Sequence, residues 1–348
     1  MINISSGSRQ PRREPWTIDR LVHERSIALG LAIDESSSIT YTSALNSYLT
    51  FCKLHNFPVD PTEETFSFFT VYMSSYIKPD SVNSYLSGIC NQLEPFFPDV
   101  RKYRMSPLVA RTLAGCRRRF GSPIKRKRPL SRSDLAFVTS RLAFSDSHDD
   151  RLFIAMLTTG FEGLLRTHEM AFPDKRNLQN YQKTSLRHTV DIKPSQYSFL
   201  LPAHKADRFF EGNTVIIKKN NLPSDLHFLF IRYLASRDSL HPIKPELWLR
   251  QSGVVPMRNW FMGCLRQFFP KNIGGQSMRA GGATALAEDG VPPNIIQAIG
   301  RWASTAFQIY IRKNPVLLQA LLFSRPCHQL SQPTLPMARK SADATVSS

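Results

Sequence analysis

A run of small residues surrounds a single arginine near the end of the chain, in QSMRAGGATALAEDG from Gln276 to Gly290. Glycine and alanine on a helix let a neighbouring backbone approach closely and leave little room for water. Arg279 in such surroundings is costly unless an anion meets its charge. Gln276 lies three residues earlier and therefore on the same helical face. The stretch predicts a closely packed helix that presents an arginine to an anion.

The charge of the whole chain indicates what that anion is. Its 348 residues suffice for two ordinary domains, and 45 Lys and Arg against 27 Asp and Glu give a formal net charge of +18. This excess favours a polyanion, with nucleic acid as the leading partner and an anionic membrane surface as the alternative. No apolar run reaches the length of a membrane helix, and the N-terminus lacks a signal-peptide core. We expect a protein without membrane spans that is not secreted.

Several classes of site find no support in the sequence. The five cysteines are scattered and contain no Cys-x-x-Cys pair, so we expect reduced thiols rather than disulfides or zinc fingers. No Walker motif and no Gly-rich dinucleotide loop is present. We therefore expect neither a metal nor a cofactor.

Periodicity and turn residues divide the chain into five parts. They are a flexible basic arm (1–16), a helical region (17–120), a basic linker rich in Pro and Ser (121–130), a mixed region (131–325) and a disordered tail (326–348). In the helical region, one apolar stripe at helical spacing comprises Tyr41, Leu45, Tyr48, Leu49 and Cys52. The next helix is expected to have Asp60 as its N-cap and Pro61 at its first position.

The mixed region combines helices with a short sheet. Ser131 and Asp134 have the spacing of a capping box at the start of a helix. Residues 196–202 and 213–219 read as two strands joined across a turn that contains Gly212. The expected fold class is α+β, mostly α: an all-helical domain followed by a mixed domain with a small antiparallel sheet.

Basic side chains gather where the two regions meet. We assign DNA binding to Arg117, Arg118, Arg119, Lys125, Arg126, Lys127 and Arg128. Residues 125–128 also have the composition of a nuclear-localisation patch, and the plainer interpretation is a linker that follows phosphates or is simply solvated.

Reactive or phosphate-binding side chains occur at four places: Arg166 with Glu169, Lys205, Gln276 with Arg279, and Arg301 with Trp302 and Tyr310. Several of them have an ordinary explanation when taken alone. Arg166 and Glu169 could form an ion pair on a helix surface. Lys205 could be one more lysine in a hairpin. Trp302 and Tyr310 could belong to the core.

In chain order, these residues resemble the tyrosine recombinases, also called the phage integrase family. The strongest local match is RAGGATALAEDGV, followed by IIQAIGRW and a tyrosine nine residues after Arg301. The forms HKADRFFEGNT, RAGGAT and GRWASTAFQIYIR look most like integrase-like proteins of fungal mobile elements. The resemblance covers most of the chain and implies a helical, SAM-like core-binding domain followed by the catalytic domain of DNA breaking-rejoining enzymes.

The resemblance implies a DNA strand transferase that needs no metal and proceeds through a 3′-phosphotyrosine intermediate. Tyr310 would be the nucleophile, because a phenol ionises more easily than an aliphatic hydroxyl. Arg166 and Arg279 would clamp the phosphate oxygens, and Lys205 would protonate the departing 5′ oxygen. Glu169 would orient other groups without touching DNA.

The chain departs from the family pattern at two positions. Gln276 stands where the family usually has histidine, and it can donate a hydrogen bond but cannot shuttle a proton. By distance to Tyr310, the second His/Trp position falls on Arg301, although Trp302 could fill that role by packing and an indole hydrogen bond. We favour Trp302 for this role and Arg301 for a phosphate contact.

The sequence is compatible with three activities. The first is an active site-specific recombinase or integrase of a mobile element, the second a catalytically impaired, domesticated relative that only binds DNA, and the third a type IB topoisomerase. The expected partners are double-stranded DNA and further copies of the chain, as a tetramer on synapsed DNA. The expected location is the nucleus in a eukaryote, and otherwise the cytoplasm or nucleoid.

Overall fold

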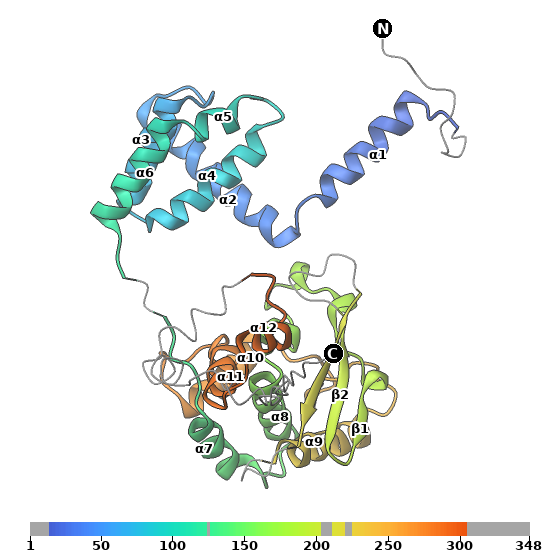
Figure 1. Cartoon of the computed structure of the whole chain (residues 1–348). Helices are drawn as coiled ribbons and strands as arrows, with labels where there is room; N and C mark the ends of the chain where they lie inside the picture. The colour runs from blue at the N-terminus through green and yellow to red at the C-terminus, as the bar shows by residue number, and fades with distance from the viewer. Residues whose placement is uncertain (1–13, 124–125, 203–210, 220–224, 305–348) are drawn as a thin grey trace, which may run out of the picture. The chain divides into compact units, whose positions relative to one another are not determined.

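The computed structural model describes residues 14–123, 126–202, 211–219 and 225–304 (Figure 1). The chain divides into two compact units, Met1–Lys125 and Arg126–Ser348. In the described ranges, no helix combines the length and the apolar character that crossing a membrane requires.

The first unit is built from helices alone in its described part. They are α1 (Ile18–Leu31), α2 (Glu35–His55), α3 (Glu63–Ser74), α4 (Pro79–Leu93), α5 (Val100–Arg104) and α6 (Pro107–Phe120). Aromatic side chains pack together within its core, where the ring of Tyr48 meets Phe66 and Phe69 at centroid distances of 5.6 and 5.5 Å. No residue of α1 is buried.

Two details predicted for this unit are wrong. The N-cap of α3 is Thr62 rather than Asp60, because Thr62 and Thr65 each accept a hydrogen bond from the other's backbone N–H. The buried stripe of α2 is rotated from the expected one: Leu49 is exposed, while Ala44 and Phe51 are buried. Packing of α2 against α4 decides this face.

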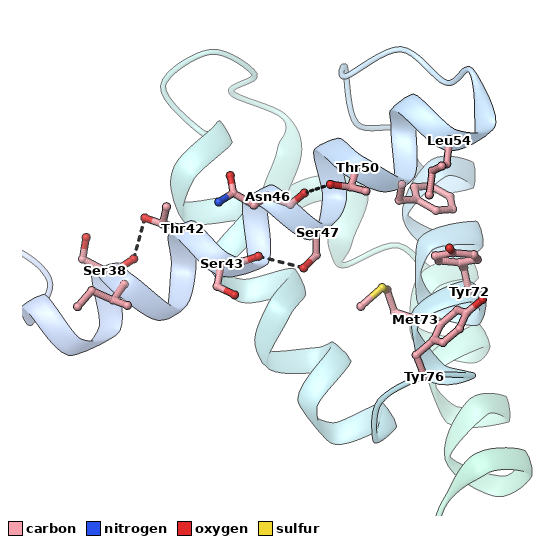
Figure 2. A pocket seen from close by; sticks show the side chains of 12 residues that line it. Ser38, Thr42, Ser43, Asn46, Ser47, Thr50, Leu54, Tyr72, Met73 and Tyr76 are labelled. Carbon is pink, nitrogen blue, oxygen red and sulfur yellow. Dashed lines mark hydrogen bonds between the residues drawn. The ribbon is translucent and has the colours of Figure 1, made fainter. Parts of the chain in front are cut away.

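A groove runs between α2 and the end of α3 (Figure 2). Its α2 side carries Thr42, Ser47 and Thr50, whose hydroxyls each donate to the carbonyl four residues earlier at 2.8–3.0 Å. Tyr72 and Tyr76 border the other side. The hydroxyl protons are thus used within the helix, and the residues that line the groove carry no charged side chain.

The second unit adds a sheet to its helices. The helices are α7 (Arg132–Leu142), α8 (His148–Glu162), α9 (Leu226–Leu240), α10 (Arg258–Phe268), α11 (Ser277–Glu288) and α12 (Pro293–Ile299). Four short 3-10 turns follow α8: η1 (Thr167–Glu169), η2 (Arg176–Leu178), η3 (Tyr181–Lys183) and η4 (Arg187–Thr189). The strands are β1 (Asp191–Lys193), β2 (Gln196–Leu201) and β3 (Asn213–Lys218), antiparallel in the order β1-β2-β3. The predicted fold class is confirmed, and β1 is an additional strand.

The core of the second unit surrounds α8. This helix is buried on nearly all sides, so it reads as a continuous apolar run rather than as an amphipathic pattern. Strands β2 and β3 alternate in the expected way and turn Tyr197, Phe199 and Ile217 inward. Tyr197 stacks on Phe230 of α9 with the ring centroids 3.9 Å apart.

The segment before α7 is built into the second unit. The backbone N–H of Arg128 donates to Asn272 O at 2.8 Å, and that of Leu130 donates to Ser277 O at 3.0 Å. The side chain of Leu130 is buried. The capping box predicted for Ser131 and Asp134 is present. Residues 126–130 therefore fix the start of the second unit against the beginning of α11.

On the face of α11 that carries Gly281 and Gly282, no side chain separates the helix from the neighbouring backbone. A Cβ atom on Gly281 would collide with the carbonyl oxygen of Leu130, and one on Gly282 with the carbonyl oxygen of Phe161 in α8. The expected close packing of this small-residue helix is confirmed. It brings the backbone of α11 directly against the end of α8.

We expect Gly282→Ala to lower the free energy of unfolding by about 1–3 kcal/mol, because the methyl group overpacks a backbone contact. Urea denaturation followed by circular dichroism measures this. The matched control is Gly263→Ala in α10, where a Cβ meets nothing within 4 Å. The control should be neutral or stabilising by up to about 1 kcal/mol. Equal effects of the two substitutions would contradict the packing described here.

Candidate active site

The site begins where α8 ends. Gly163 caps the helix, and Leu164 follows with a φ of 51°, a left-handed conformation that is unusual for a side chain with a Cβ. Such a conformation costs about 1–3 kcal/mol and persists only where the surroundings enforce it. Leu164 is fully buried. The resulting reversal aims the Leu164 carbonyl at the side chains described next.

Glu169, the last residue of η1, is buried and binds Arg166, the residue that precedes η1. Glu169 accepts from the Arg166 backbone N–H at 2.8 Å through Oε2 and from the Arg166 guanidinium at 2.9 Å through Oε1. The Glu169 side chain is 1% exposed and that of Arg166 22% exposed. The pair is therefore not a solvated ion pair on a helix surface. The carboxylate fixes both the backbone and the side chain of Arg166.

The same turn is joined to the start of α11. Thr167 Oγ1 donates to Gly275 O at 3.1 Å, and a Cβ on Gly275 would meet that hydroxyl. Gln276 follows as the exposed N-cap residue of α11. Residues 166–169 and 275–279, far apart in sequence, therefore meet at this point.

Arg279 is held from three directions. Its Nη1 donates to Leu164 O at 2.9 Å, and its Nη2 donates to Gly300 O. The ring of Trp302 covers the guanidinium, with a centroid 4.1 Å from Cζ. The residue is 4% exposed. Hydrogen bonds in its plane and an aromatic face against it fix the orientation of the guanidinium.

Arg301 adds a third guanidinium. Its backbone is left-handed, with a φ of 54°, and its side chain is 7% exposed. Nη2 donates to Gly163 O at 3.2 Å and to Leu164 O at 3.3 Å, and it lies 3.8 Å from Glu169 Oε2. Burial lowers the pKa of this guanidinium, and the Glu169 charge opposes that shift. Arg301 and Arg279, both of which we expected on a phosphate, direct these donors at protein carbonyls.

Trp302 reaches Arg279 because of a glycine. A Cβ on Gly300 would overlap the indole ring, so only glycine lets Trp302 fold across this position. Gln297 Nε2 donates to Trp302 O at 3.1 Å and holds the turn. Of the two residues considered for the second His/Trp position, Trp302 is the one that contacts Arg279 through its ring.

These contacts form one connected network. Arg166 binds Glu169, Glu169 lies beside Arg301, Arg301 and Arg279 share the carbonyl of Leu164, and Trp302 covers Arg279. The network contains three guanidinium groups and one carboxylate, so positive charge is in excess. A partly exposed Arg166 beside this excess can bind an anion such as a phosphate.

Three predicted residues, Lys125, Lys205 and Tyr310, lie outside the described residues. The other basic residues expected to bind DNA differ in how they are engaged. Arg117 pairs with Asp80 at 2.9 Å and Arg128 with Asp134 at 2.7 Å.

Lys127 Nζ donates to Lys271 O at 2.6 Å. Arg118, Arg119 and Arg126 are exposed. The basic residues expected to bind DNA are therefore a mixture of paired and exposed side chains.

Two acceptors of this network, the carbonyl oxygens of Leu164 and Gly300, could not be predicted from the sequence. Every residue has such a carbonyl, so no residue type signals it. Only the left-handed backbone at Leu164 and Arg301, which is set by tertiary packing, directs these oxygens at the arginines.

We expect Glu169→Gln to lower the free energy of unfolding by about 3 kcal/mol or more, because the charges of Arg166 and Arg301 lose their buried counter-charge. Thermal and urea unfolding measure this. Glu94→Gln is the matched control, since its pair with Arg101 is exposed on both sides and its loss should matter little. A Glu169 variant as stable as the control would contradict a structural role for this carboxylate.

Similar solved structures identify the fold of the chain. No family model matches the chain, and no curated protein matches it. Among solved structures, the XerH site-specific recombinase in a post-cleavage complex with palindromic difH substrate matches with a TM-score of 0.58 at 14% identity, over 81% of this chain and 78% of that chain. The Tn1549 transposon integrase in complex with transposon right end DNA matches with a TM-score of 0.53 at 12% identity, over 84% and 92%. A lambda integrase dimer bound to a COC′ core site matches with a TM-score of 0.51 at 13% identity, over 84% and 94%. The chain therefore has the tyrosine recombinase fold.

Proposed function

We propose that the protein is a site-specific DNA recombinase that cuts and rejoins DNA through a 3′-phosphotyrosine intermediate. The observation that carries this proposal is the network in which Arg166, Glu169, Arg279 and Arg301 meet at the junction of α8, η1 and α11. Its excess positive charge suits a phosphodiester. The fold supports the proposal, because the similar structures are those of recombinases and integrases in complex with DNA.

In this proposal, the arginines stabilise the charge that develops on phosphorus. Arg166 keeps part of its guanidinium exposed while Glu169 holds its direction, so it donates to a non-bridging oxygen. Arg279 is fixed before DNA arrives, so little reorganisation is needed in the transition state. Removing one such preorganised donor typically slows a reaction by about 100- to 1,000-fold.

The remaining steps fall to two residues outside the described ranges. The Tyr310 hydroxyl loses its proton to solvent as its oxygen attacks phosphorus, the bond from phosphorus to the 5′ oxygen breaks, and Lys205 gives the departing oxygen its proton. The phosphotyrosine keeps the energy of the broken bond. A 5′ hydroxyl from another strand then attacks phosphorus and returns a proton to the neutral Lys205, while the released tyrosine oxygen takes a proton from solvent, which completes the recombination.

A second function, DNA binding without cleavage, is favoured by one observation. Gln276, the exposed N-cap of α11, stands three residues before Arg279, where the family resemblance leads us to expect histidine. An amide neither accepts nor releases a proton near neutral pH. A chain that binds DNA but lacks a proton carrier at this position would be a domesticated relative of the active enzymes.

The wider setting is part of the same proposal. Double-stranded DNA is the partner, and synapsis of two duplexes calls for a homotetramer. In a eukaryotic cell the recombination takes place in the nucleus, and in other cells in the cytoplasm or at the nucleoid. The finer resemblance to proteins of fungal mobile elements stays a prediction. The similarity to a transposon integrase supports only the broader link to mobile elements.

We expect the full-length protein to form a covalent adduct with a nicked duplex that carries its target site, and Tyr310→Phe to abolish the adduct. A denaturing gel with end-labelled DNA detects the shifted band, and the 3′ or 5′ label shows which end is joined. Candidate target sites come from short repeats in the DNA that flanks the gene. Relaxation of any supercoiled plasmid without sequence preference would instead indicate a topoisomerase.

We expect Gln276→His to raise the cleavage rate by about 10-fold or more, since a positioned proton carrier contributes roughly 100- to 10,000-fold in other enzymes. Single-turnover cleavage from pH 5.5 to 8.5 measures this, and the gain should appear as the new imidazole loses its proton. Gln276→Asn is the control, because it keeps an amide at the same place. An unchanged rate in the histidine variant would show that Gln276 does not limit the reaction.

A further inference from the structure

Two consecutive 3-10 turns between η1 and the sheet expose a row of polar side chains. On and beside η2 the exposed residues are Lys175, Arg176 and Asn177, and on η3 they are Tyr181, Gln182 and Lys183. We call these six residues the two-turn surface. It contains three basic residues, two amides, one tyrosine and no acid.

The segment that carries this surface is well anchored. Phe172 donates from its backbone N–H to Pro256 O at 2.9 Å, and Arg258 donates to Phe172 O at 2.8 Å. The Asp174 carboxylate accepts from the backbone N–H of Asn259 at 2.8 Å. The rings of Phe172 and Tyr181 meet edge to face at 5.0 Å. The base of the segment is thus tied to the start of α10.

Within the segment, side chains also shape the turns. Gln179 Nε2 donates to Pro173 O at 3.1 Å, and Asn180 Oδ1 accepts from the backbone N–H of Gln182 at 2.9 Å. Polar side chains next to the two-turn surface are therefore committed to the backbone. The exposed ones project from a framework that these bonds define.

The basic charges on the surface are not neutralised by acids within the described residues. Lys175, Arg176 and Lys183 make no ion pair there, whereas the next basic residue, Arg187, binds Asp238 at 2.7 Å. Asp174, the acid at the edge of the surface, is occupied as an acceptor for Asn259. A row of unneutralised basic groups interleaved with amides and an aromatic ring has the chemistry of a nucleic-acid contact.

The surface continues to the arginine network. His168 lies on η1 between Arg166 and Glu169, and the residue is exposed. Partial desolvation lowers the pKa of the imidazole, the Glu169 charge opposes that shift, and the positive charges of Arg166, Lys183 and Arg279 add to it. Along the chain, the two-turn surface follows η1 directly, and the Lys183 charge acts on His168 of that turn.

We propose that the two-turn surface binds the duplex beside the scissile phosphate, with Lys175, Arg176 and Lys183 on backbone phosphates and Gln182 on a base edge. The inference rests on the proposed function, because it needs DNA at Arg166. Lysine and arginine on the segment that directly follows η1 meet phosphates of the duplex that Arg166 contacts. A glutamine amide both donates and accepts, which suits the paired groups on the edge of adenine.

The first test compares two triple variants of the full chain on a labelled duplex of mixed sequence. Lys175→Ala, Arg176→Ala and Lys183→Ala are combined in one variant. The control combines Arg141→Ala, Lys193→Ala and Lys218→Ala, which remove the same charge from exposed positions elsewhere in the second unit. Fluorescence anisotropy at several salt concentrations gives the affinity and its dependence on salt.

We expect the surface variant to bind about tenfold or more weakly at low salt. Its plot of log affinity against log salt should be shallower by about 2 to 3, since each phosphate contact contributes roughly 0.9. The control should change the slope by less than one contact. Equal slopes for the two variants, with salt-dependent binding by the unaltered protein, would overturn this inference while the proposed function stands. Failure of the unaltered protein to bind duplex DNA would overturn both.

The second test concerns base recognition. Duplexes with randomised sequence are selected for binding to the unaltered protein and to Gln182→Ala, and the bound pools are sequenced. We expect the variant to lose preference at one or two adjacent base pairs while its salt dependence stays unchanged. Identical sequence preferences in both pools would overturn the assignment of Gln182 to a base.

Discussion

A single carboxylate, shielded from water, sets the geometry of the candidate site. Glu169 has its oxygens on the backbone and guanidinium of Arg166 and beside the guanidinium of Arg301. Without it, two arginines would face each other in a place where burial already disfavours the charged form of Arg301. The Glu169 carboxylate thus allows the guanidinium groups of Arg166 and Arg301 to lie close together where they are largely shielded from water. Because it balances only part of their positive charge, the network remains attractive to an anion.

Close backbone packing supplies the other constraint. The glycines of α11 let it approach Leu130 and Phe161, and the same approach carries Arg279 to the carbonyl of Leu164. The left-handed turn at Leu164 completes the arrangement by aiming one oxygen at two guanidinium groups. The packing of α11 and the position of Arg279 therefore depend on the same contacts, and a substitution that loosens α11 moves this arginine.

The sequence predicted features whose physical cause is local or periodic. The packing of the RAGGAT helix, the Ser131 capping box and two of the three strands follow from side-chain size, capping chemistry and alternation. The predictions were wrong where several residues could fill the same role. Thr62 rather than Asp60 caps α3, and packing against α4 leaves Leu49 of α2 exposed. Order and spacing singled out Arg166, Arg279 and Arg301, which the structure brings into one network, while their role in catalysis stays a prediction. The carbonyl acceptors and the inward direction of Arg301 were not predicted, because they depend on backbone conformations that tertiary contacts impose.

The overlap between Gly300 and the ring of Trp302 has a consequence for how this site can change over evolutionary time. Any side chain at position 300 displaces the indole, and loss of the indole uncovers the face of Arg279. The two positions are therefore not independent sites for mutation. A substitution of Gly300 moves the Trp302 ring off Arg279. Restoring the contact then requires a second change that places another side chain against this guanidinium.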